Sequence, residues 1–139
     1  MVRDTTTGLD FESRVSINMN GIDLTKHNLY KYLKAKGINY KSIISKKLLP
    51  DECYLVDNHL YVYEKKFQKT AGSADEKPQT CGFKIHQFRK IGAALGINEV
   101  SYTYIFNDWF KRPEYKDMLD YIRSTDGCDY MFEEEVNGN

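Results

Sequence analysis

The stretch LLPDECYLVDNHLYVYEKKFQ, residues 48–68, decides the fold. It contains two apolar runs, 52–56 and 60–67, separated by Asp57-Asn58. Short runs rich in aromatic and branched residues, bounded by turn-forming residues, are typical of β-strands. Two such runs with so short a break between them predict a β-hairpin closed by a tight turn.

The open end of this hairpin gathers charged side chains on one face. Because side chains alternate across a strand, Glu64 and Lys66 are expected to point to the same side of the sheet. A two-residue turn pairs Asp51 with Glu64 if residues 57–58 form it, and with Lys66 if residues 58–59 form it. Either register places Asp51 on the face of the other two charges. A three-residue turn would place it on the opposite face unless a bulge corrected the alternation.

The expected cluster combines two carboxylates with one ammonium, and Gln68 follows two residues further along the same face. Neighbouring carboxylates repel one another and require a cation. Carboxylate oxygens together with water suit Mg²⁺ or Mn²⁺ rather than Zn²⁺. A metal ion beside a lysine can polarise a phosphoryl oxygen, acidify a bound water and stabilise developing negative charge. The pattern therefore predicts metal-assisted hydrolysis of phosphodiester bonds.

The chain as a whole predicts a single α/β domain over residues 1–139. Three successive strands joined by short turns should form an antiparallel meander, and a fourth strand that follows a helix should lie parallel to a neighbour. The result is a mixed sheet flanked by helices. Residues 69–78 are small and polar and predict a loop, and the tail 133–139 is expected to fray.

The helices and strands follow from local patterns. Thr7 and Thr25 are placed to cap the first two helices. In the third helix, Phe83, Gln87, Ile91 and Leu95 recur at a spacing of four residues. The expected elements are helices 8–19 and 26–36, strands 42–49, 52–56 and 60–67, helix 79–95, strand 100–106, helix 113–122 and strand 128–133.

Pro50-Asp51, twelve intervening residues and then Glu64-x-Lys66 resembles the signature of the PD-(D/E)XK nuclease superfamily. That superfamily includes many restriction endonucleases, Holliday-junction resolvases and repair nucleases. Its core is a helix, a three-stranded antiparallel meander, a helix and a further strand. The expected element order over residues 8–106 is similar to this core, with one additional helix. The resemblance therefore implies a restriction-endonuclease-like fold.

The same resemblance implies a role for each residue of the motif. Asp51 and Glu64 would bind Mg²⁺, for which Mn²⁺ can substitute, and Lys66 would be the catalytic lysine. Gln68 resembles the glutamine that many members carry after that lysine. The segment GLDFE resembles the first-helix pattern whose glutamate reaches the metal in some members, and this position is Glu12.

Further residues are candidates for contacts with DNA phosphates. The loop 69–78 leaves the strand that carries the expected site, so it must pass close to a bound substrate. The N-terminus of the following helix would add backbone N–H donors, and a pair of lysines precedes Pro50. The candidate DNA-contact residues are Lys46, Lys47, Lys69, Ser73 and Lys77.

Composition limits the remaining possibilities. Lysine plus arginine and aspartate plus glutamate number 20 each, so the formal net charge is zero and any DNA-binding surface must be a local patch. No apolar run approaches the ~20 residues that span a bilayer. The three cysteines are far apart and form no Cys-x-x-Cys pair, which predicts reduced thiols in a cytoplasmic protein. The three histidines are scattered, so we expect no histidine metal site, and Trp109 is expected to pack in the core.

Several functions remain open. The leading hypothesis is a restriction-type endonuclease acting on double-stranded DNA, and a Holliday-junction resolvase or repair nuclease is the alternative with the same chemistry. Because such enzymes cut two strands with one site per chain, a homodimer is expected. In another class, the chain is a DNA-binding or protein-interaction module that keeps the nuclease fold without cleaving. The neutral charge and the eleven tyrosines also allow a purely protein-binding scaffold.

Overall fold

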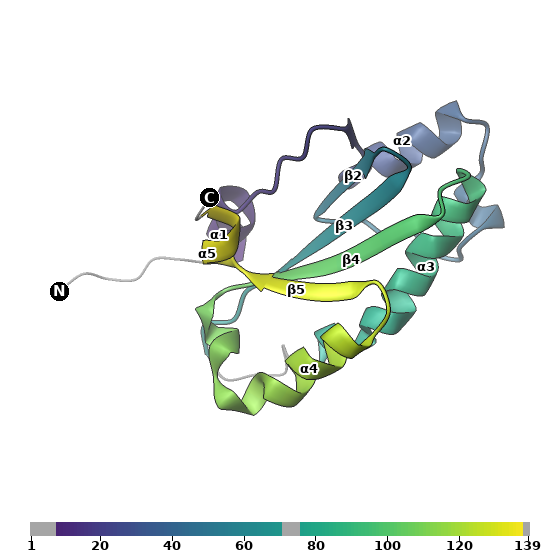
Figure 1. The fold of residues 1–139 in the computed structure, drawn as a ribbon. Coiled ribbons are helices and arrows are strands. Elements are labelled where there is room, and N and C mark those ends of the chain that lie inside the picture. Colours follow the sequence, from purple (N-terminus) through teal and green to yellow (C-terminus); the bar gives the residue numbers. More distant parts are fainter. Residues whose placement is uncertain (1–7, 71–75, 138–139) are drawn as a thin grey trace.

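The computed structural model describes residues 8–70 and 76–137, and these form a mixed five-stranded sheet with helices on both faces (Figure 1). The strand order is β1-β2-β3-β4-β5. The first three strands pair antiparallel, whereas β3, β4 and β5 run parallel. The strands are β1 (Ile22–Asp23), β2 (Glu52–Val56), β3 (His59–Lys66), β4 (Glu99–Phe106) and β5 (Cys128–Phe132). The α/β class and the mixed sheet expected from the sequence are confirmed.

The helices divide unequally between the two faces of the sheet. The main core cluster joins one face to α2, α3 and α4, while a smaller cluster around Phe11, Val15 and Ile105 joins the other face to α1 and α5. Within the described residues, no helix has the length and apolar character needed to cross a membrane. The helices are α1 (Gly8–Arg14), α2 (Asn28–Ala35), α3 (Cys81–Ala94), α4 (Lys116–Ser124) and α5 (Glu133–Asn137), with 3₁₀ turns at Tyr40–Ser42, Lys77–Thr80, Asp108–Lys111 and Pro113–Tyr115.

The β2–β3 hairpin has the first of the two expected registers. Val56 pairs with His59, so Asp57 and Asn58 form a two-residue turn. Both turn residues have positive φ, 48° and 66°, as a type I′ turn requires. The pairing continues to Glu52 opposite Tyr63. One step further, Asp51 lies opposite Glu64, on the same side of the sheet.

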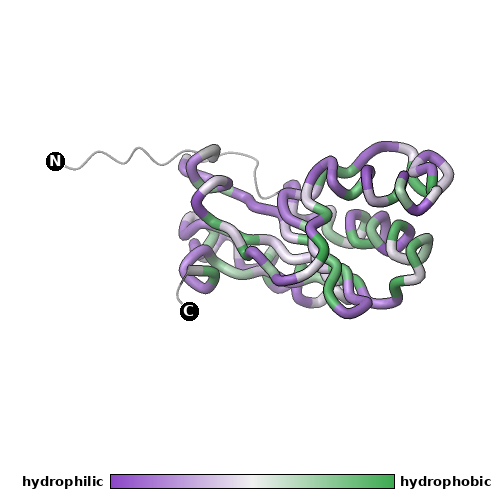
Figure 2. Tube along the Cα trace, turned by 90° about the horizontal axis from the view of Figure 1, so that it is seen from above, coloured by the Kyte–Doolittle hydropathy of each residue, from purple (hydrophilic) through white to green (hydrophobic). Residues whose placement is uncertain are grey.

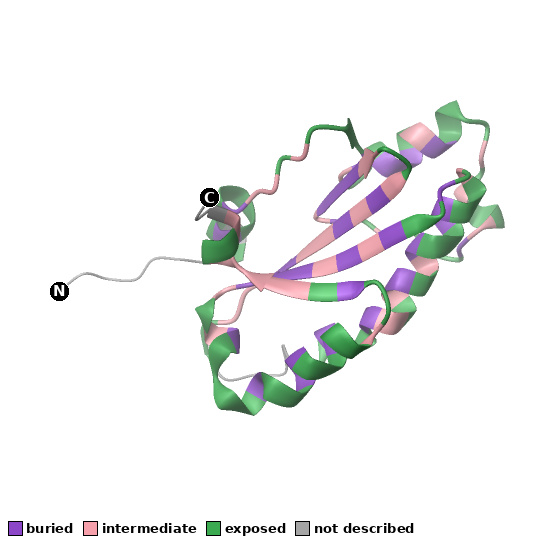
Figure 3. Cartoon of the chain, viewed as in Figure 1, coloured by how far each residue is buried: buried purple, intermediate pink, exposed green. Residues whose placement is uncertain are grey.

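Buried and partly buried residues alternate along the first half of β3 (Figure 3). Leu60 and Val62 of β3 belong to the core cluster beneath α3, and Glu64 continues this row toward the end of the strand. Lys65 points to the opposite face, toward α1, where its ammonium reaches the backbone carbonyl of Glu12. Along the helices, hydrophobic and hydrophilic residues are interspersed (Figure 2).

The expected strand at 42–49 is wrong, and the first strand of the meander is Ile22–Asp23 instead. Ile44 is 3% exposed, but it packs into the core from an irregular segment rather than from a strand. The phenol of Tyr30 holds this segment by bonding to both the N–H and the carbonyl of Leu48. The short apolar run 42–49 therefore packs into the core without pairing with another strand. Periodicity alone does not distinguish a buried strand from a buried irregular segment.

The first helix is shorter than predicted: it ends at Arg14 rather than near Met19. The backbone N–H groups of Ile17 and Asn18 donate to the carboxylate of Glu52 instead of continuing the helix. Asn18 also adopts a positive φ of 50°, which interrupts a right-handed helix. Thr7, the expected cap, lies outside the described residues.

Two further expectations are corrected at α3 and at the C-terminal tail. The buried face of α3 carries Cys81, Ile85, Phe88, Ile91 and Gly92, whereas Phe83 is 60% exposed. With 3.6 residues per turn, positions four apart drift around the helix, so only part of the predicted stripe faces inward. The tail expected to fray forms α5, anchored by an ion pair from Arg14 and by apolar packing of its last turn.

The left-handed turn makes a prediction about stability. Asn58→Gly should raise the free energy of unfolding by about 0.5 kcal/mol, because glycine adopts positive φ without steric cost. Asn58→Ala should lower it by about 1 kcal/mol, because a β-carbon disfavours this conformation. Urea unfolding of the two variants measures both effects. An alanine variant as stable as the glycine variant would contradict the turn conformation.

Candidate active site

Asp51 and Glu64, from the two strands of the hairpin, lie side by side. The Asp51 Oδ2 atom accepts a 2.8 Å hydrogen bond from the backbone N–H of Lys65, which ties the residue before β2 to β3. Its Oδ1 atom accepts a 3.0 Å bond from the Lys26 ammonium. The register of β2 and β3, continued by one residue, sets Glu64 opposite Asp51, close enough for each carboxyl group to affect the pKa of the other. The two acids predicted from the sequence are therefore neighbours on one face of the sheet.

Their surroundings separate the pKa values of the two acids. Burial, followed by the charge and the hydrogen bond of Asp51, raises the pKa of Glu64 to about 8, although Lys66 and Lys26 act in the opposite direction. Burial alone would raise the pKa of Asp51 as well, but the Lys65 N–H and the Lys26 ammonium outweigh it and lower that pKa. Near neutral pH, the pair holds a proton on Glu64 and a negative charge on Asp51.

Lys66 shares a pocket of about 220 Å³ with Glu64 at the end of β3. The pocket lies where the segment 47–49, the sheet and α3 meet. Lys47, predicted as a DNA contact, lines it, and so does Lys84 from α3, which sequence reasoning missed. Lys84 lies one turn before the buried Phe88, so both residues are on one side of the helix. This spacing is the sequence signal that could have placed Lys84 at the pocket. Three lysines and one carboxyl group thus line a single small pocket.

Lys26 is the second site residue that the sequence did not indicate. It lies 25 residues from its partner Asp51, between β1 and α2, where no motif marks it. The hydrogen bond to Asp51 raises the pKa of Lys26 against the opposing effect of burial, and the charges of Asp51, Glu12 and Glu64 add to the increase. Glu12 is therefore within electrostatic range of this ammonium, but its side chain is exposed.

The residues at this site suit a magnesium ion held by two carboxylates. Mg²⁺ commonly uses one or two carboxylates and keeps several waters. Asp51 and Glu64 supply such a pair, and the proton that Glu64 retains beside its charged neighbour is one that a divalent cation can replace. Among residues 8–70 and 76–137, no three His, Cys, Asp or Glu side chains converge as a metal-binding group. Glu12 therefore does not complete a three-carboxylate site.

Gln68 lies apart from the pocket of Glu64 and Lys66, against expectation. The strand ends at Lys66, so the alternation does not extend to Gln68. The side chain of Asn107 holds the Gln68 backbone, accepting from its N–H at 3.1 Å and donating to its carbonyl at 2.7 Å. Gln68 instead lines a separate pocket of about 230 Å³ with Arg14 and other residues.

The structure distributes the predicted DNA contacts unevenly. Lys47 lines the pocket of Glu64 and Lys66, whereas Lys69 lines the separate pocket that contains Gln68. Lys46 and Lys77 are exposed and line neither pocket. Ser73 lies outside the described residues.

The opposite face of the hairpin holds a buried ion pair that sequence reasoning also missed. Lys65 and Glu52 are 2.8 Å apart, with side chains only 6% and 5% exposed. Glu52 also accepts from the hydroxyls of Ser16 and Tyr54, at 3.2 and 2.5 Å. Burial alone would raise the pKa of Glu52, but Lys65 and Tyr54 outweigh it and lower the pKa. This pair is fully hydrogen-bonded and structural, in contrast to the Asp51–Glu64 pair.

The remaining candidate residues are the three cysteines, the three histidines and Trp109. Cys53, Cys81 and Cys128 are buried free thiols. The histidines are scattered: His27 precedes α2, His59 hydrogen-bonds to a serine of β4, and His86 is exposed on α3. Trp109 packs against the main core and donates to the Tyr115 hydroxyl at 2.7 Å.

The raised pKa of Glu64 predicts a pH-dependent effect of Glu64→Gln. Between the ordinary value of 4.5 and about 8, the native state holds a proton that the unfolded chain releases, so stability falls as pH rises through this window. Glutamine removes this loss, and the variant should exceed the parent by on the order of 3 kcal/mol at pH 8 but not at pH 4.5. Urea unfolding in EDTA from pH 4 to 9 tests this. Parallel pH profiles would contradict it.

Lys65→Met should destabilise the fold by about 3 kcal/mol, because it leaves the Glu52 carboxylate buried without its cation. Lys66→Met, one residue further along the same strand, is the matched control and should change the free energy of unfolding by less than about 1 kcal/mol. Chemical denaturation of both variants measures the difference. Equal losses would show that the buried pair is not a stabilising contact.

Comparison with protein-family models, with curated proteins and with solved structures finds no match to this chain. Its function must therefore be inferred from the arrangement of its own residues.

Proposed function

We propose that this protein is a magnesium-dependent endonuclease of the PD-(D/E)XK type that hydrolyses phosphodiester bonds in DNA. The observation that carries the proposal is the position of Asp51 opposite Glu64 on one face of the hairpin, with Lys66 lining the pocket of Glu64. Two carboxyl groups held side by side and only partly compensated lower the stability of a fold. Groups with pKa values perturbed in this way are concentrated at functional sites. Such a pair beside a lysine suits metal-assisted phosphodiester chemistry.

The topology supports a restriction-endonuclease-like core. An antiparallel β1-β2-β3 arrangement preceded by α1, followed by a crossover through α3 to the parallel strand β4, has the element order of that superfamily. The additional helix α2 lies between β1 and β2. The acid pair and Lys66 fall at the open end of the β2–β3 hairpin, where the motif requires them.

Asp51 and Glu64 are the residues that would hold Mg²⁺, and Glu64 would release its proton as the ion binds. A bound Mg²⁺ supplies Lewis-acid polarisation of a phosphoryl oxygen and a more acidic water. Lys66 places a positive charge in the same pocket, where it would orient the attacking water or stabilise charge on the phosphate. Lys47 and Lys84 would bind neighbouring phosphates of the strand. Lys26 would keep Asp51 ionised before the substrate arrives.

The expected substrate is double-stranded DNA, and cleavage of both strands by one site per chain favours a two-fold homodimer. A restriction-type activity remains the leading hypothesis, with junction resolution or repair as the alternative of the same chemistry. The Lys26–Asp51 ion pair favours a second candidate function of another class, because the Lys26 ammonium already occupies the place at Asp51 that a metal ion would take. In that case the protein is a DNA-binding or protein-interaction module that does not cleave.

Cleavage assays separate these functions. Supercoiled plasmid and four-way junctions, incubated with the parent protein and Mg²⁺, should be cut, and EDTA should abolish cutting. Asp51→Asn and Lys66→Met should each lower the cleavage rate by about 100-fold or more, because they remove a metal ligand and the pocket cation. Circular dichroism should show that both variants remain folded.

Lys90→Met is the control, since Lys90 is exposed on α3 and lines none of the pockets described. It should cut as fast as the parent. If the parent binds DNA but cuts neither substrate with Mg²⁺ or Mn²⁺, the non-cleaving module replaces the nuclease. If Asp51→Asn and Lys66→Met cut at the parental rate, the residue assignment is wrong.

A further inference from the structure

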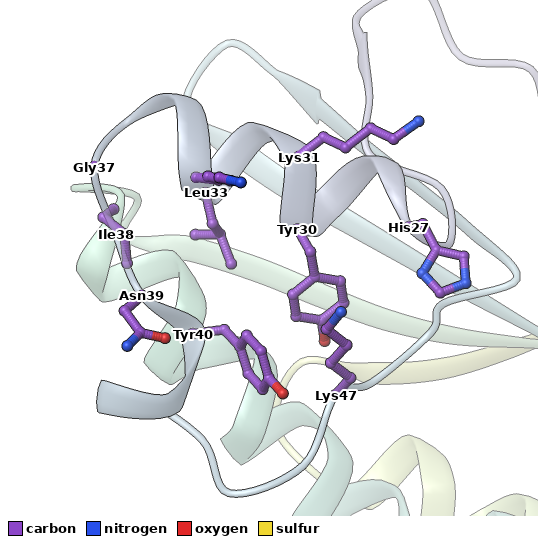
Figure 4. Close-up of a pocket in the computed structure, with 10 residues that line it drawn as sticks. His27, Tyr30, Lys31, Leu33, Gly37, Ile38, Asn39, Tyr40 and Lys47 are labelled. Carbon is purple, nitrogen blue, oxygen red and sulfur yellow. The ribbon is translucent and has the colours of Figure 1, made fainter.

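A third and larger pocket, of about 930 Å³, lies between α2 and the segment that follows it (Figure 4). Its volume is within the range of small-molecule sites in proteins. The apolar part of its lining comes from Leu33 and Ile38, and from the rings of Tyr30 and Tyr40, which point into the space beneath the helix. The nuclease chemistry proposed above makes no use of this pocket.

The aromatic wall of the pocket is fixed in place. The Tyr30 and Tyr40 rings meet edge to face, with centroids 5.3 Å apart and planes at 76°. Tyr30 is 8% exposed, and its hydroxyl is anchored to the backbone of Leu48. Tyr40 is half-buried and its hydroxyl takes no part in that anchor. The pocket therefore offers one rigid, accessible ring against which a flat ligand can stack.

The charged part of the lining is entirely basic. Lys31, Lys34 and Lys47 are among the lining residues, although the Lys31 ammonium points away from the two tyrosine rings (Figure 4), and no aspartate or glutamate lines the pocket. The Lys47 Nζ atom lies 5.2 Å from the centroid of the Tyr30 ring and 5.3 Å from that of Tyr40. The whole chain has equal numbers of acidic and basic residues, so the excess of positive charge is a property of this pocket and not of the protein as a whole. A ligand that is both flat and anionic matches the pocket, and a nucleotide has both properties.

The two pockets are neighbours. Lys47 lines both the aromatic pocket and the pocket of Glu64 and Lys66. Lys26, which holds Asp51, directly precedes His27, which lines the aromatic pocket. A strand of DNA lying at the acid pair would therefore pass within reach of the aromatic pocket.

We propose that the aromatic pocket binds an unpaired nucleotide of a DNA strand, with its base stacked on Tyr40 and its phosphates held by Lys47 and Lys34. This inference rests on the proposed nuclease function, which identifies the ligand as DNA. It further specifies that the substrate has an unpaired nucleotide near the cut. A base must leave the duplex before an aromatic side chain can stack on its face. Fully paired DNA would leave the pocket empty.

The test measures binding of a ten-nucleotide single strand containing 2-aminopurine, in EDTA so that no cleavage intervenes. The same strand in a blunt duplex is the comparison. The parent should bind the single strand more tightly than the duplex. Tyr40→Ala should weaken single-strand binding at least about fivefold, and Tyr40→Phe should keep it, because stacking needs the ring and not the hydroxyl. Tyr121→Ala, at an exposed tyrosine of α4, should bind as the parent does.

Lys34→Met provides a second variant at an exposed position, where folding does not depend on the side chain. It should reduce the slope of log affinity against log salt by about 0.7, the value for one phosphate contact with a single strand. Parental affinity in Tyr40→Ala together with a parental salt slope in Lys34→Met would overturn the inference. Equal affinity for the blunt duplex would also overturn it.

Failure of this inference differs from failure of the nuclease proposal. If the parent cuts plasmid with Mg²⁺ but the pocket variants bind single strands normally, the nuclease proposal stands and the pocket assignment fails. If the variants lose single-strand binding but the parent never cuts, the pocket assignment stands and the nuclease proposal fails.

Discussion

The register between β2 and β3 is the constraint on which both charged clusters depend. Because opposed residues share a face, the two-residue turn brings Asp51 and Glu64 together on the side of α3. The same alternation sends the next residue of each strand, Glu52 and Lys65, to the side of α1, where they pair. A shift of the strand register by one residue would move every side chain of one strand to the opposite face and would separate the members of both clusters. The left-handed turn that prevents this shift is thus a requirement of the site.

The two clusters resolve their charges in opposite ways. Glu52 has a cation, two hydroxyl donors and backbone N–H groups, so its negative charge is fully compensated. These bonds end α1 at Arg14, and the bond from Lys65 to the Glu12 carbonyl holds that helix against the sheet. On the other face, Glu64 retains its proton because burial, followed by the negative charge of its neighbour Asp51, raises its pKa. A compensated pair contributes to the fold, whereas an uncompensated pair is available to bind a cation.

The distribution of lysines connects the proposed nuclease site to the aromatic pocket. The chain has no net charge, so attraction of a polyanion depends on where its charges lie. Lys47, Lys66 and Lys84 line the pocket of Glu64, and Lys31 and Lys34 extend the basic lining along α2. Lys47 belongs to both pockets and directly precedes the segment that the Tyr30 hydroxyl anchors. Two pockets that share Lys47, one with an aromatic wall and the other beside the acid pair, suit a single nucleic-acid strand.

The sequence by itself determined the features that depend on neighbouring residues. The hairpin and the α/β order follow from alternation and local periodicity over a few positions. The shared face of Asp51, Glu64 and Lys66 follows for either two-residue turn, and the structure decides that residues 57–58 form it. The tertiary structure alone decided the rest. The strand at Ile22–Asp23 is too short to carry a period, and it exists because β2 offers an edge to pair with. Lys26 and Lys84 reach the site from other elements of the fold. Gln68 lies outside the site, and its backbone N–H donates to the side chain of Asn107. Such contacts join residues distant along the chain, so no local pattern records them.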